Sequence, residues 1–295
     1  MKFAAIDVGS NAVRLLLKRV IDDGHDIIYK KESLIRMPIR LGDDAFMEQR
    51  ISEDKTRQLI SAMKGFKHLM DAYQPINYLA YATSAIREAV NGDEIAGRIK
   101  KETGIALKII DGQKEAHAIF SNHVEENLEN GGEYLYIDAG GGSTELILFA
   151  EGKIIASDSF RVGAVRILQG LDTKDDWAQI KNWVKKNAKP YKKLVAIGSG
   201  GNINKIYRFA RKEEGKPVSY KKIIKIKNYI EKYSLSDRIK ILRLRPDRAD
   251  VIIPAINVYL SVFKWAGIEK MYVPQIGLAD GMIHILYNQF KDGQT

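Results

Sequence analysis

The sequence predicts an α/β protein built from two similar halves. The chain has 295 residues, 45% of them hydrophobic and 28% charged, a balance typical of globular domains and a length that suits two of them. Residues 6–17 align without gaps with residues 137–148, with Ile, Asp, Gly and two Leu coinciding. In both segments an apolar run ends in aspartate and small residues before a second apolar run begins, which predicts a hairpin. We infer a duplication in which each half opens with such a hairpin.

The elements of the first half follow from local patterns. Apolar runs bounded by turn residues predict strands, and apolar residues three and four apart, such as Ile60, Met63, Phe66 and Met70, predict a helix. We expect antiparallel strands at 3–7, 12–20 and 26–35, a helix at 52–73, a strand at 78–82, a helix from about 85, a strand at 107–110 and a helix at 113–126.

The second half repeats this order after a polar, glycine-rich boundary at 129–133. We therefore expect an N-terminal domain at 1–125 and a C-terminal domain at 126–280, with a closing helix at 281–295 that packs back on the first. The expected elements are strands at 134–138, 145–149 and 153–160, a helix at 175–187, a strand at 194–197, helices over most of 202–264, a strand at 271–273 and a helix at 281–290.

Composition excludes several classes of protein. The chain has no cysteine, which excludes disulfide scaffolds, thiolate zinc sites and cysteine nucleophiles. Its five histidines include no H-x-x-x-H pair, which argues against histidine-bound zinc. The longest apolar tract, residues 251–265, is shorter than a bilayer span and contains Pro254, Asn257 and Lys264. We expect a cytoplasmic protein with no membrane partner.

The positive charge of the chain is concentrated. The net charge is +10, yet residues 181–245 alone hold 20 Lys and Arg against four acids. Clustered positive charge attracts polyanions, so one interpretation is a polyanionic partner. A solvated, lysine-rich helical surface is an equally good interpretation. Nucleic acid is an improbable partner, because no recognition motif accompanies the charge.

Two hairpin turns carry the first candidate site residues. In the turn formed by Asp7, Gly9, Ser10 and Asn11, glycine permits close approach of a ligand and exposed N–H groups can hold phosphate oxygens, although an ordinary turn favours the same residues. The second turn, Asp138 to Glu145, is more specific, because its three glycines cost conformational entropy that a plain turn does not require. Its acids offer oxygen ligands for Mg²⁺. Its other members are Gly140, Gly141, Gly142, Ser143 and Thr144.

Three further positions lie where a strand meets a helix or where a helix begins. A third glycine turn, Gly198, Ser199 and Gly200, leads into a helix and is either an anion site or a tight packing point. Arg87 follows a strand and could bind phosphate in a two-pronged contact or lie on the surface. Glu115 occupies the first turn of a helix, where the dipole alone favours an acid.

These residues lie in sequence blocks that resemble the exopolyphosphatase/guanosine pentaphosphate phosphatase family (Ppx/GppA). The resemblance implies two ribonuclease-H-like domains, as in actin and sugar kinases, around an interdomain cleft. It implies a short form without the C-terminal HD-like domain that many members carry. The matching blocks are, in order, AAIDVGSNAVRLLL, IRLGDDAF, ATSAIREAVN, DGQKEAHAIF, YIDAGGGSTELILF, RVGAVRI, AIGSGGN, DRADVIIPA and GLADGMI.

The resemblance also implies a role for each candidate residue. Glu115 matches the family's catalytic glutamate, the general base for the attacking water. Asp138 and Glu145 match acids that bind the divalent metal or place the water. Asp7 matches the first phosphate turn, where its carboxylate could hold the same cation. The residues matching phosphate contacts are Gly9, Ser10, Asn11, Arg87, Gly140, Gly141, Gly142, Ser143 and Thr144, and Gly198, Ser199 and Gly200 lie where related kinases hold adenosine.

The function that we expect is that of an exopolyphosphatase, which releases terminal orthophosphate from inorganic polyphosphate with Mg²⁺. The alternatives are a guanosine pentaphosphate 5′-phosphohydrolase that uses the same site, and a non-catalytic sensor of (p)ppGpp or polyphosphate. The acids at positions 7, 115, 138 and 145 count against the sensor. By resemblance we also expect a homodimer.

Overall fold

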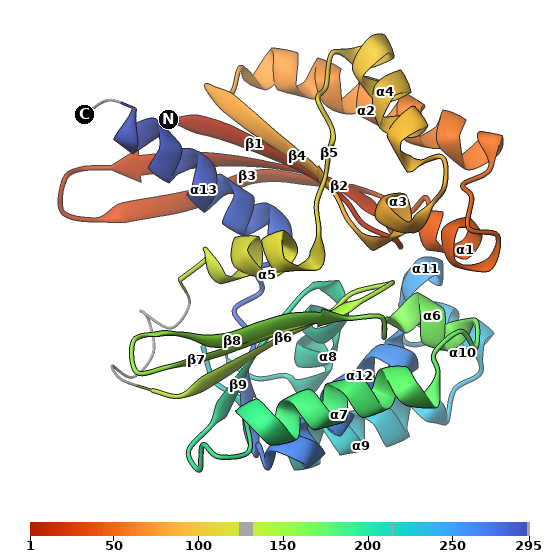
Figure 1. Ribbon diagram of the computed structural model, residues 1–295, viewed down its shortest axis with the longest axis vertical. Helices are drawn as coiled ribbons and strands as arrows, with labels where there is room; N and C mark the ends of the chain where they lie inside the picture. The colour runs from red at the N-terminus through yellow and green to blue at the C-terminus, as the bar shows by residue number, and fades with distance from the viewer. Residues whose placement is uncertain (124–131, 214, 294–295) are drawn as a thin grey trace. The chain divides into compact units, whose positions relative to one another are not determined.

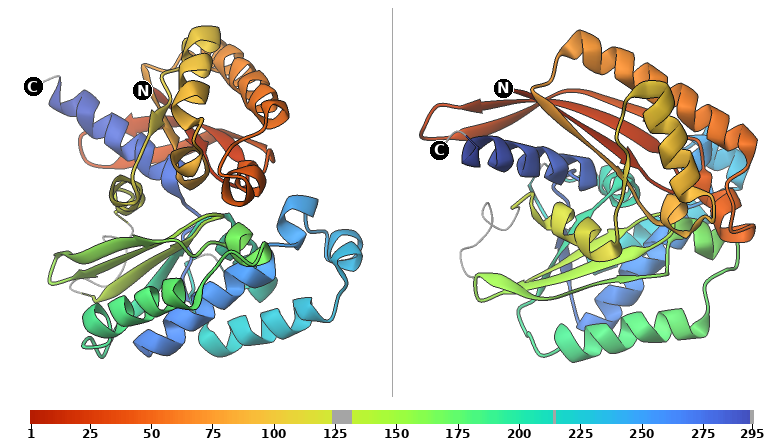
Figure 2. Two further views of the ribbon diagram at one scale, coloured as in Figure 1. Left: turned by 45° about the vertical axis from the view of Figure 1, so that its right-hand side comes forward. Right: turned by 45° about the horizontal axis from the view of Figure 1, so that its top comes forward.

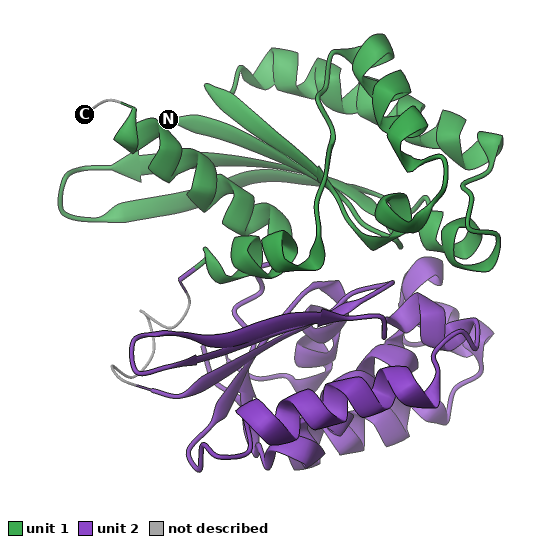
Figure 3. Ribbon diagram, viewed as in Figure 1, with its two compact units in different colours: residues 1–122, 278–295 green, residues 123–277 purple. Residues whose placement is uncertain are grey.

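The computed structural model describes residues 1–123, 132–213 and 215–293, and the chain divides into two compact units (Figures 1 and 3). Unit 1 consists of residues 1–122 and 278–295, and unit 2 of residues 123–277. Unit 1 is thus built from both ends of the chain. The part of the expected boundary at 129–131 lies outside the described residues.

Unit 1 contains a five-stranded sheet with the order β3-β2-β1-β4-β5. β1 pairs antiparallel with β2 and parallel with β4, so the hairpin runs on into a parallel part of the sheet. β1 is buried along nearly its whole length, which explains why its sequence is continuously apolar. The strands are β1 (Lys2–Val8), β2 (Val13–Asp22), β3 (Ile27–Met37), β4 (Asn77–Ala82) and β5 (Lys108–Ile109).

Helices cover both faces of this sheet (Figure 2). α2 (Glu53–Tyr73) and α4 (Gly92–Thr103) pack together on one face, and α5 (Gly112–Phe120) and α13 (Leu278–Asp292) on the other. α13 buries an apolar face that includes Met282 against the core of β1 and β2. The short helices α1 (Leu41–Met47) and α3 (Ser84–Glu88) lie near the β1–β2 turn.

Unit 2 contains a six-stranded sheet with the order β10-β11-β9-β6-β7-β8. β6 pairs antiparallel with β7 and parallel with β9. The strands are β6 (Tyr134–Ala139), β7 (Thr144–Ala150), β8 (Lys153–Phe160), β9 (Val195–Ser199), β10 (Val218–Ser219) and β11 (Lys270–Tyr272). The helices are α6 (Ala164–Leu168), α7 (Lys174–Asn187), α8 (Gly201–Ala210), α9 (Tyr220–Glu231), α10 (Leu235–Lys240), α11 (Pro246–Ala249) and α12 (Ile252–Ala266).

α12 is the central core helix of unit 2. It contacts α6, α7, α8 and α9, and its residues Ile252, Ile256, Tyr259 and Phe263 are at most 1% exposed. The stretch Pro246–Ala266, which contains α12, is long and apolar enough by composition to cross a membrane. Its burial in the core of unit 2 is a sufficient reason for that apolar composition.

The internal duplication predicted from residues 6–17 and 137–148 is confirmed. Both sheets place a β-hairpin beside a parallel strand, in the equivalent orders β3-β2-β1-β4-β5 and β8-β7-β6-β9-β11. Both hairpin turns are closed by the same backbone bond, from Gly9 to Ala12 at 3.2 Å and from Gly140 to Ser143 at 2.9 Å. Each unit therefore has the α/β fold that the sequence predicts.

Some element boundaries differ from those expected. Within the described residues, the helix predicted at 113–126 ends at Phe120, because the Asn122 side chain donates to the Ile119 carbonyl at 2.7 Å and His123 has a positive φ of 49°. The predicted part at 124–126 lies outside the described residues. The strand expected at 107–110 pairs only through Lys108 and Ile109. α1 and α6 were not expected, since neither carries a long apolar period.

Candidate active site

The first glycine turn, residues 9–12, directs its carbonyl groups at the chain around α1. The Ser10 carbonyl accepts from the Gly42 N–H at 2.8 Å, and the Asn11 carbonyl accepts from the Arg40 N–H at 3.2 Å. A Cβ on Gly42 would lie 3.1 Å from the Ser10 Cβ, so the bare backbone at Gly42 permits this approach. The hydroxyls of Ser10 and Ser84 lie 2.8 Å apart, which ties the turn to α3 as well.

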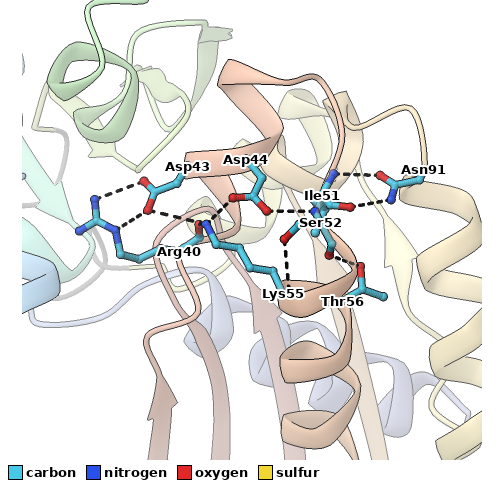
Figure 4. Close-up of polar contacts among 8 residues, drawn as sticks. All are labelled: Arg40, Asp43, Asp44, Ile51, Ser52, Lys55, Thr56 and Asn91. Carbon is cyan, nitrogen blue, oxygen red and sulfur yellow. Dashed lines mark hydrogen bonds and ion pairs between the residues drawn. The ribbon is translucent and has the colours of Figure 1, made fainter.

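A polar network fixes the chain at Arg40, where it meets this turn (Figure 4). Arg40 has a positive φ of 57°, a costly conformation for a residue with a side chain. Lys55 Nζ donates to the Arg40 carbonyl at 2.6 Å and pairs with Asp44 at 2.7 Å, and the Arg40 guanidinium binds Asp43 at 2.8 Å. Although burial opposes it, hydrogen bonds from Lys55 and Ser52 hold the pKa of Asp44 below its ordinary value.

Asp7, at the end of β1, is 5% exposed and forms an ion pair with Arg14. The two residues are cross-strand partners in the β1–β2 ladder, so their side chains share one face of the sheet. The carboxylate therefore has a cation beside it in this structure. Any metal bound by Asp7 would share that carboxylate with Arg14.

Arg87 and Glu115 lie together in unit 1, as neither motif alone could predict. The distance from Arg87 Nη1 to Glu115 Oε2 is 3.6 Å, and the same nitrogen donates to the Ile110 carbonyl at 2.7 Å. Glu115 is 9% exposed in the first turn of α5, whose N-cap Asp111 accepts from the Lys114 N–H at 2.8 Å. Arg87 thus places a positive charge beside a largely buried glutamate.

The second glycine turn, in unit 2, is also held through hydrogen bonds to its carbonyl groups. The carbonyls of residues 140–142 accept hydrogen bonds from α6: from its first two N–H groups at 2.9 and 2.8 Å and from Arg166 Nε at 2.6 Å. A Cβ on Gly163 would lie 2.5 Å from the carbonyl carbons of this turn, so only glycine fits there. Among the described residues, the N–H groups of Gly141, Gly142 and Ser143 have no acceptor. A turn with engaged carbonyls and available N–H groups can bind an anion.

Asp138 and Glu145 flank this turn as cross-strand partners of β6 and β7. Opposite residues in an antiparallel pair have Cβ atoms about 5 Å apart on one face, so the two carboxylates share one environment. Asp138 Oδ2 accepts from the Ser199 hydroxyl at 2.6 Å. Glu145 Oε1 accepts from the hydroxyls of Ser143 at 2.7 Å and Ser159 at 2.8 Å.

The third glycine turn meets the second at Asp138. The parallel pairing of β6 and β9 places Ser199 opposite Asp138. Gly200 has φ of 91°, and a Cβ there would lie 2.8 Å from Asp138 Oδ1. Glycine is therefore required both for the backbone conformation and for the approach of the carboxylate.

Tyr259 of α12 forms hydrogen bonds with the backbone at both of these turns. The sequence did not identify it as a candidate site residue. Its hydroxyl donates to the Ser199 carbonyl at 3.0 Å and accepts from the Ala139 N–H at 3.3 Å. Burial, and then the negative charge of Asp138, raises the pKa of Tyr259 well above its ordinary value. The phenol therefore stays neutral and serves as a donor.

Three cations lie along α8, the helix that follows the third turn. Burial, and then the positive charges of Arg208 and Arg248, lower the pKa of Lys205. Arg248 Nη1 donates to Asn202 at 3.1 Å, and its guanidinium lies over Gly201, where a Cβ would meet it at 2.6 Å. This end of unit 2 is suited to an anionic group.

The donor chemistry of the acids fits a hard divalent cation. Asp138 and Glu145 provide carboxylate oxygens with serine hydroxyls around them, the ligand type that Mg²⁺ prefers. Within the described residues, no group of three or more acidic or histidine side chains gathers as a complete metal cage. Mg²⁺ is usually bound through one or two carboxylates plus substrate phosphates.

The chain belongs to the Ppx/GppA phosphatase family, which it matches over residues 21–290. It is 28% identical over 92% of its length to a bifunctional 3-dehydroquinate synthase/phosphatase of Fusobacterium nucleatum. It is 23% identical over 99% of its length to exopolyphosphatase 1 of Mycobacterium tuberculosis, and 23% identical over 98% to a guanosine-5′-triphosphate,3′-diphosphate pyrophosphatase of Aeromonas hydrophila. The chain spans 44%, 90% and 60% of these three relatives, respectively.

Solved structures show the same fold. An exopolyphosphatase from Cytophaga hutchinsonii matches with a TM-score of 0.84 and 22% identity, covering 98% of both chains. The Ppx/GppA enzyme of Aquifex aeolicus matches with a TM-score of 0.76 and 26% identity, covering 97% of this chain and 99% of that one. The two-domain α/β fold expected from the sequence is therefore confirmed.

Proposed function

We propose that this protein is an exopolyphosphatase that removes the terminal orthophosphate of inorganic polyphosphate in the cytoplasm. The observation that carries the proposal is the second glycine turn. The carbonyls of residues 140–142 are engaged by α6, the N–H groups of residues 141–143 have no acceptor among the described residues, and two carboxylates flank the turn. Such a turn is suited to a terminal phosphate that carries a metal ion. The family and the Mycobacterium relative named exopolyphosphatase support this chemistry.

In this proposal each candidate residue has a defined task. Glu115 accepts a proton from water as the water oxygen attacks the terminal phosphorus, and the bridging oxygen leaves on the shortened chain. Arg87 contacts phosphate and lies beside Glu115, at 3.6 Å from its carboxylate. The N–H groups of the glycine turns bind the phosphate oxygens. Asp138 and Glu145 would hold Mg²⁺, which would neutralise negative charge on the phosphoryl group, and Asp7 is the candidate metal ligand of unit 1.

A second candidate is hydrolysis of the 5′-terminal phosphate of guanosine pentaphosphate by the same residues. The observation in its favour is the set of cations along α8, Lys205, Arg208 and Arg248, which could bind a second phosphorylated end of a nucleotide. The Aeromonas relative carries a name of this kind. A sensor that binds (p)ppGpp or polyphosphate without turnover is the non-catalytic alternative.

Orthophosphate release, compared at matched concentrations, tests these functions. The substrates are long polyphosphate, tripolyphosphate, guanosine pentaphosphate and ATP, each with and without Mg²⁺. We expect Mg²⁺-dependent release that is fastest from polyphosphate. Preference for guanosine pentaphosphate would favour the second candidate, and binding without release would favour the sensor. Sedimentation in the same buffer tests the homodimer that we also propose.

A further inference from the structure

Two outer helices of unit 2, together with the exposed edge of its core helix α12, form a lysine-rich surface, which we call the basic layer. It consists of α7 with the turn that follows it to residue 193, together with α9 and α12. α7 and α9 both pack on α12, so the three helices form one layer (Figure 1). These segments hold twelve basic residues against three acids. The basic residues are all lysines: Lys174, Lys181, Lys185, Lys186, Lys189, Lys192, Lys193, Lys221, Lys222, Lys225, Lys227 and Lys264.

These lysines are not neutralised within the unit. Among the described residues, Lys227 is the single member of the basic layer with an ion pair, to Glu231 at 2.7 Å. Lys185, Lys186, Lys221 and Lys225 are all exposed. The opposite faces of the helices that carry these lysines are buried in the core. The buried residues are Ile180, Val184, Ile223, Ile226 and Ile230. The uncompensated charge is thus presented outward by a rigid support.

The outer helices of unit 1 provide an internal comparison. α2 and α4 together hold seven basic residues against six acids. Many of these are paired: Arg98 with Glu53 at 2.8 Å, Lys64 with Glu102 at 2.7 Å, and Lys67 with Asp71. A general need for a solvated surface therefore does not explain the basic layer, because unit 1 meets that need with balanced charge.

The basic layer extends away from the glycine turns of its own unit. Lys192 and Lys193 precede β9, whereas the third glycine turn lies at its other end. Five residues of strand separate these points by about 17 Å. A tripolyphosphate is too short to contact both places, whereas a long phosphate chain can.

We propose that the basic layer is a docking surface for the distal part of long inorganic polyphosphate, which it holds while the terminal phosphate occupies the glycine turns. This inference rests on the proposed exopolyphosphatase function and adds a second contact for its substrate. Charge complementarity identifies the occupant as a flexible chain of closely spaced anions. Lysine binds phosphate as a point charge and needs no fixed geometry.

Nucleic acid fits the same surface less well. Base readout most often uses arginine, and binding of single strands relies on exposed aromatic rings. The basic layer has no arginine, and its exposed aromatic residue, Tyr229, packs against Tyr233 with ring centroids 5.3 Å apart. Lysine alone supplies charge without sequence or base recognition.

The test compares two variants that remove the same charge from different units. Binding of long polyphosphate and of tripolyphosphate is measured directly at several salt concentrations, with single-stranded RNA as a competitor, and orthophosphate release is measured in parallel. One variant removes charge from the basic layer and the other from exposed sites of unit 1. The first is Lys185→Gln, Lys186→Gln, Lys221→Gln and Lys225→Gln; the second is Lys30→Gln, Lys31→Gln, Lys100→Gln and Lys101→Gln.

We expect the basic-layer variant to raise the Kd for long polyphosphate by roughly tenfold to a hundredfold, the product of four exposed charge contacts. The dependence of log Kd on log salt should weaken by about three, as expected when four phosphate contacts are lost. Tripolyphosphate hydrolysis should stay within about twofold of wild type, and the unit 1 variant should match wild type throughout.

Equal effects of the two variants on long-chain binding would overturn the docking surface, and so would RNA that binds the basic layer as tightly as polyphosphate of equal charge. Failure of the proposed function looks different. In that case wild-type protein releases no orthophosphate from either substrate, whatever the basic-layer variant does to binding.

Discussion

Gly281 in α13 allows the last helix of the chain to touch α5, and replacing it by alanine tests how α5 is held. An added Cβ would overlap the Ala118 carbonyl oxygen and lie 2.7 Å from the carbonyl carbon. This neighbour is backbone of α5, so it cannot rotate away as a side chain could. α5 and α13 would have to separate by more than an ångström to restore ordinary contact distances.

The size of the effect follows from two opposing terms. Overpacking of a well-packed site costs about 1–3 kcal/mol, occasionally more, and backbone overlap belongs at the upper end. The better helix propensity of alanine returns about 1 kcal/mol. We expect Gly281→Ala to lower the free energy of unfolding by about 2 kcal/mol, a fall in Tm of roughly 5–8 °C. Because α5 carries Glu115, turnover should fall as well.

Gly65→Ala is the matched control. Gly65 lies on the exposed side of α2 in the same unit, and an added Cβ there would have no neighbour within 4 Å. This substitution should raise the free energy of unfolding by about 0.5–1 kcal/mol through helix propensity alone. Thermal unfolding followed by circular dichroism measures both variants. If both substitutions change the free energy of unfolding in the same way, the close contact of α13 with α5 does not determine the effect of Gly281→Ala.

Five other substitutions test the site. Glu115→Gln should lower turnover by about 10²–10⁴-fold with polyphosphate binding retained; activity near that of wild type would remove its role as base. Asp138→Ala and Glu145→Ala should each raise the Mg²⁺ concentration for half-maximal activity, and unchanged values in both would place the metal elsewhere. Tyr259→Phe leaves the buried Ala139 N–H without its acceptor and should cost about 1–3 kcal/mol in chemical denaturation, whereas no loss would dismiss the bridge. Because its pKa is lowered in the native protein, ionised Asp44 stabilises the fold at pH values above about 4, and this stabilisation is lost as the pH falls further. Asp44→Asn should therefore make the free energy of unfolding depend less on pH below about 4. An acid unfolding curve parallel to that of wild type would contradict this.

The sequence predicts best what local residues determine. The glycine turns, the strands on either side of them and the duplication all depend on short segments, in which turn chemistry and apolar periodicity act directly. The long helix at 53–73 is equally clear, since its apolar spacing persists over five turns and Ser52 caps it. For such elements, only the first and last residues differ from those predicted.

The supports of the turns could not be predicted in this way. α1 and α6 are too short to show a period, yet they supply the N–H groups that engage the turn carbonyls. Tyr259 sits in an apolar helical run that any core helix would show, and its partners lie 60 and 120 residues away in the chain. Long-range contacts of this kind leave no mark in a local pattern.

The duplicated hairpins carry opposite charges at one equivalent position, which explains how one scaffold can serve two tasks. Asp7 and Asp138 end the first strand of each hairpin, but the cross-strand partner is Arg14 in unit 1 and Glu145 in unit 2. A carboxylate beside a guanidinium is already neutralised, whereas two neighbouring carboxylates repel each other until a cation joins them. The backbone is therefore shared, and the chemistry differs through one side chain. By this reasoning Asp138 and Glu145 of unit 2 are the stronger candidates for binding the metal. Asp7 can bind a metal only to the extent that its ion pair with Arg14 opens.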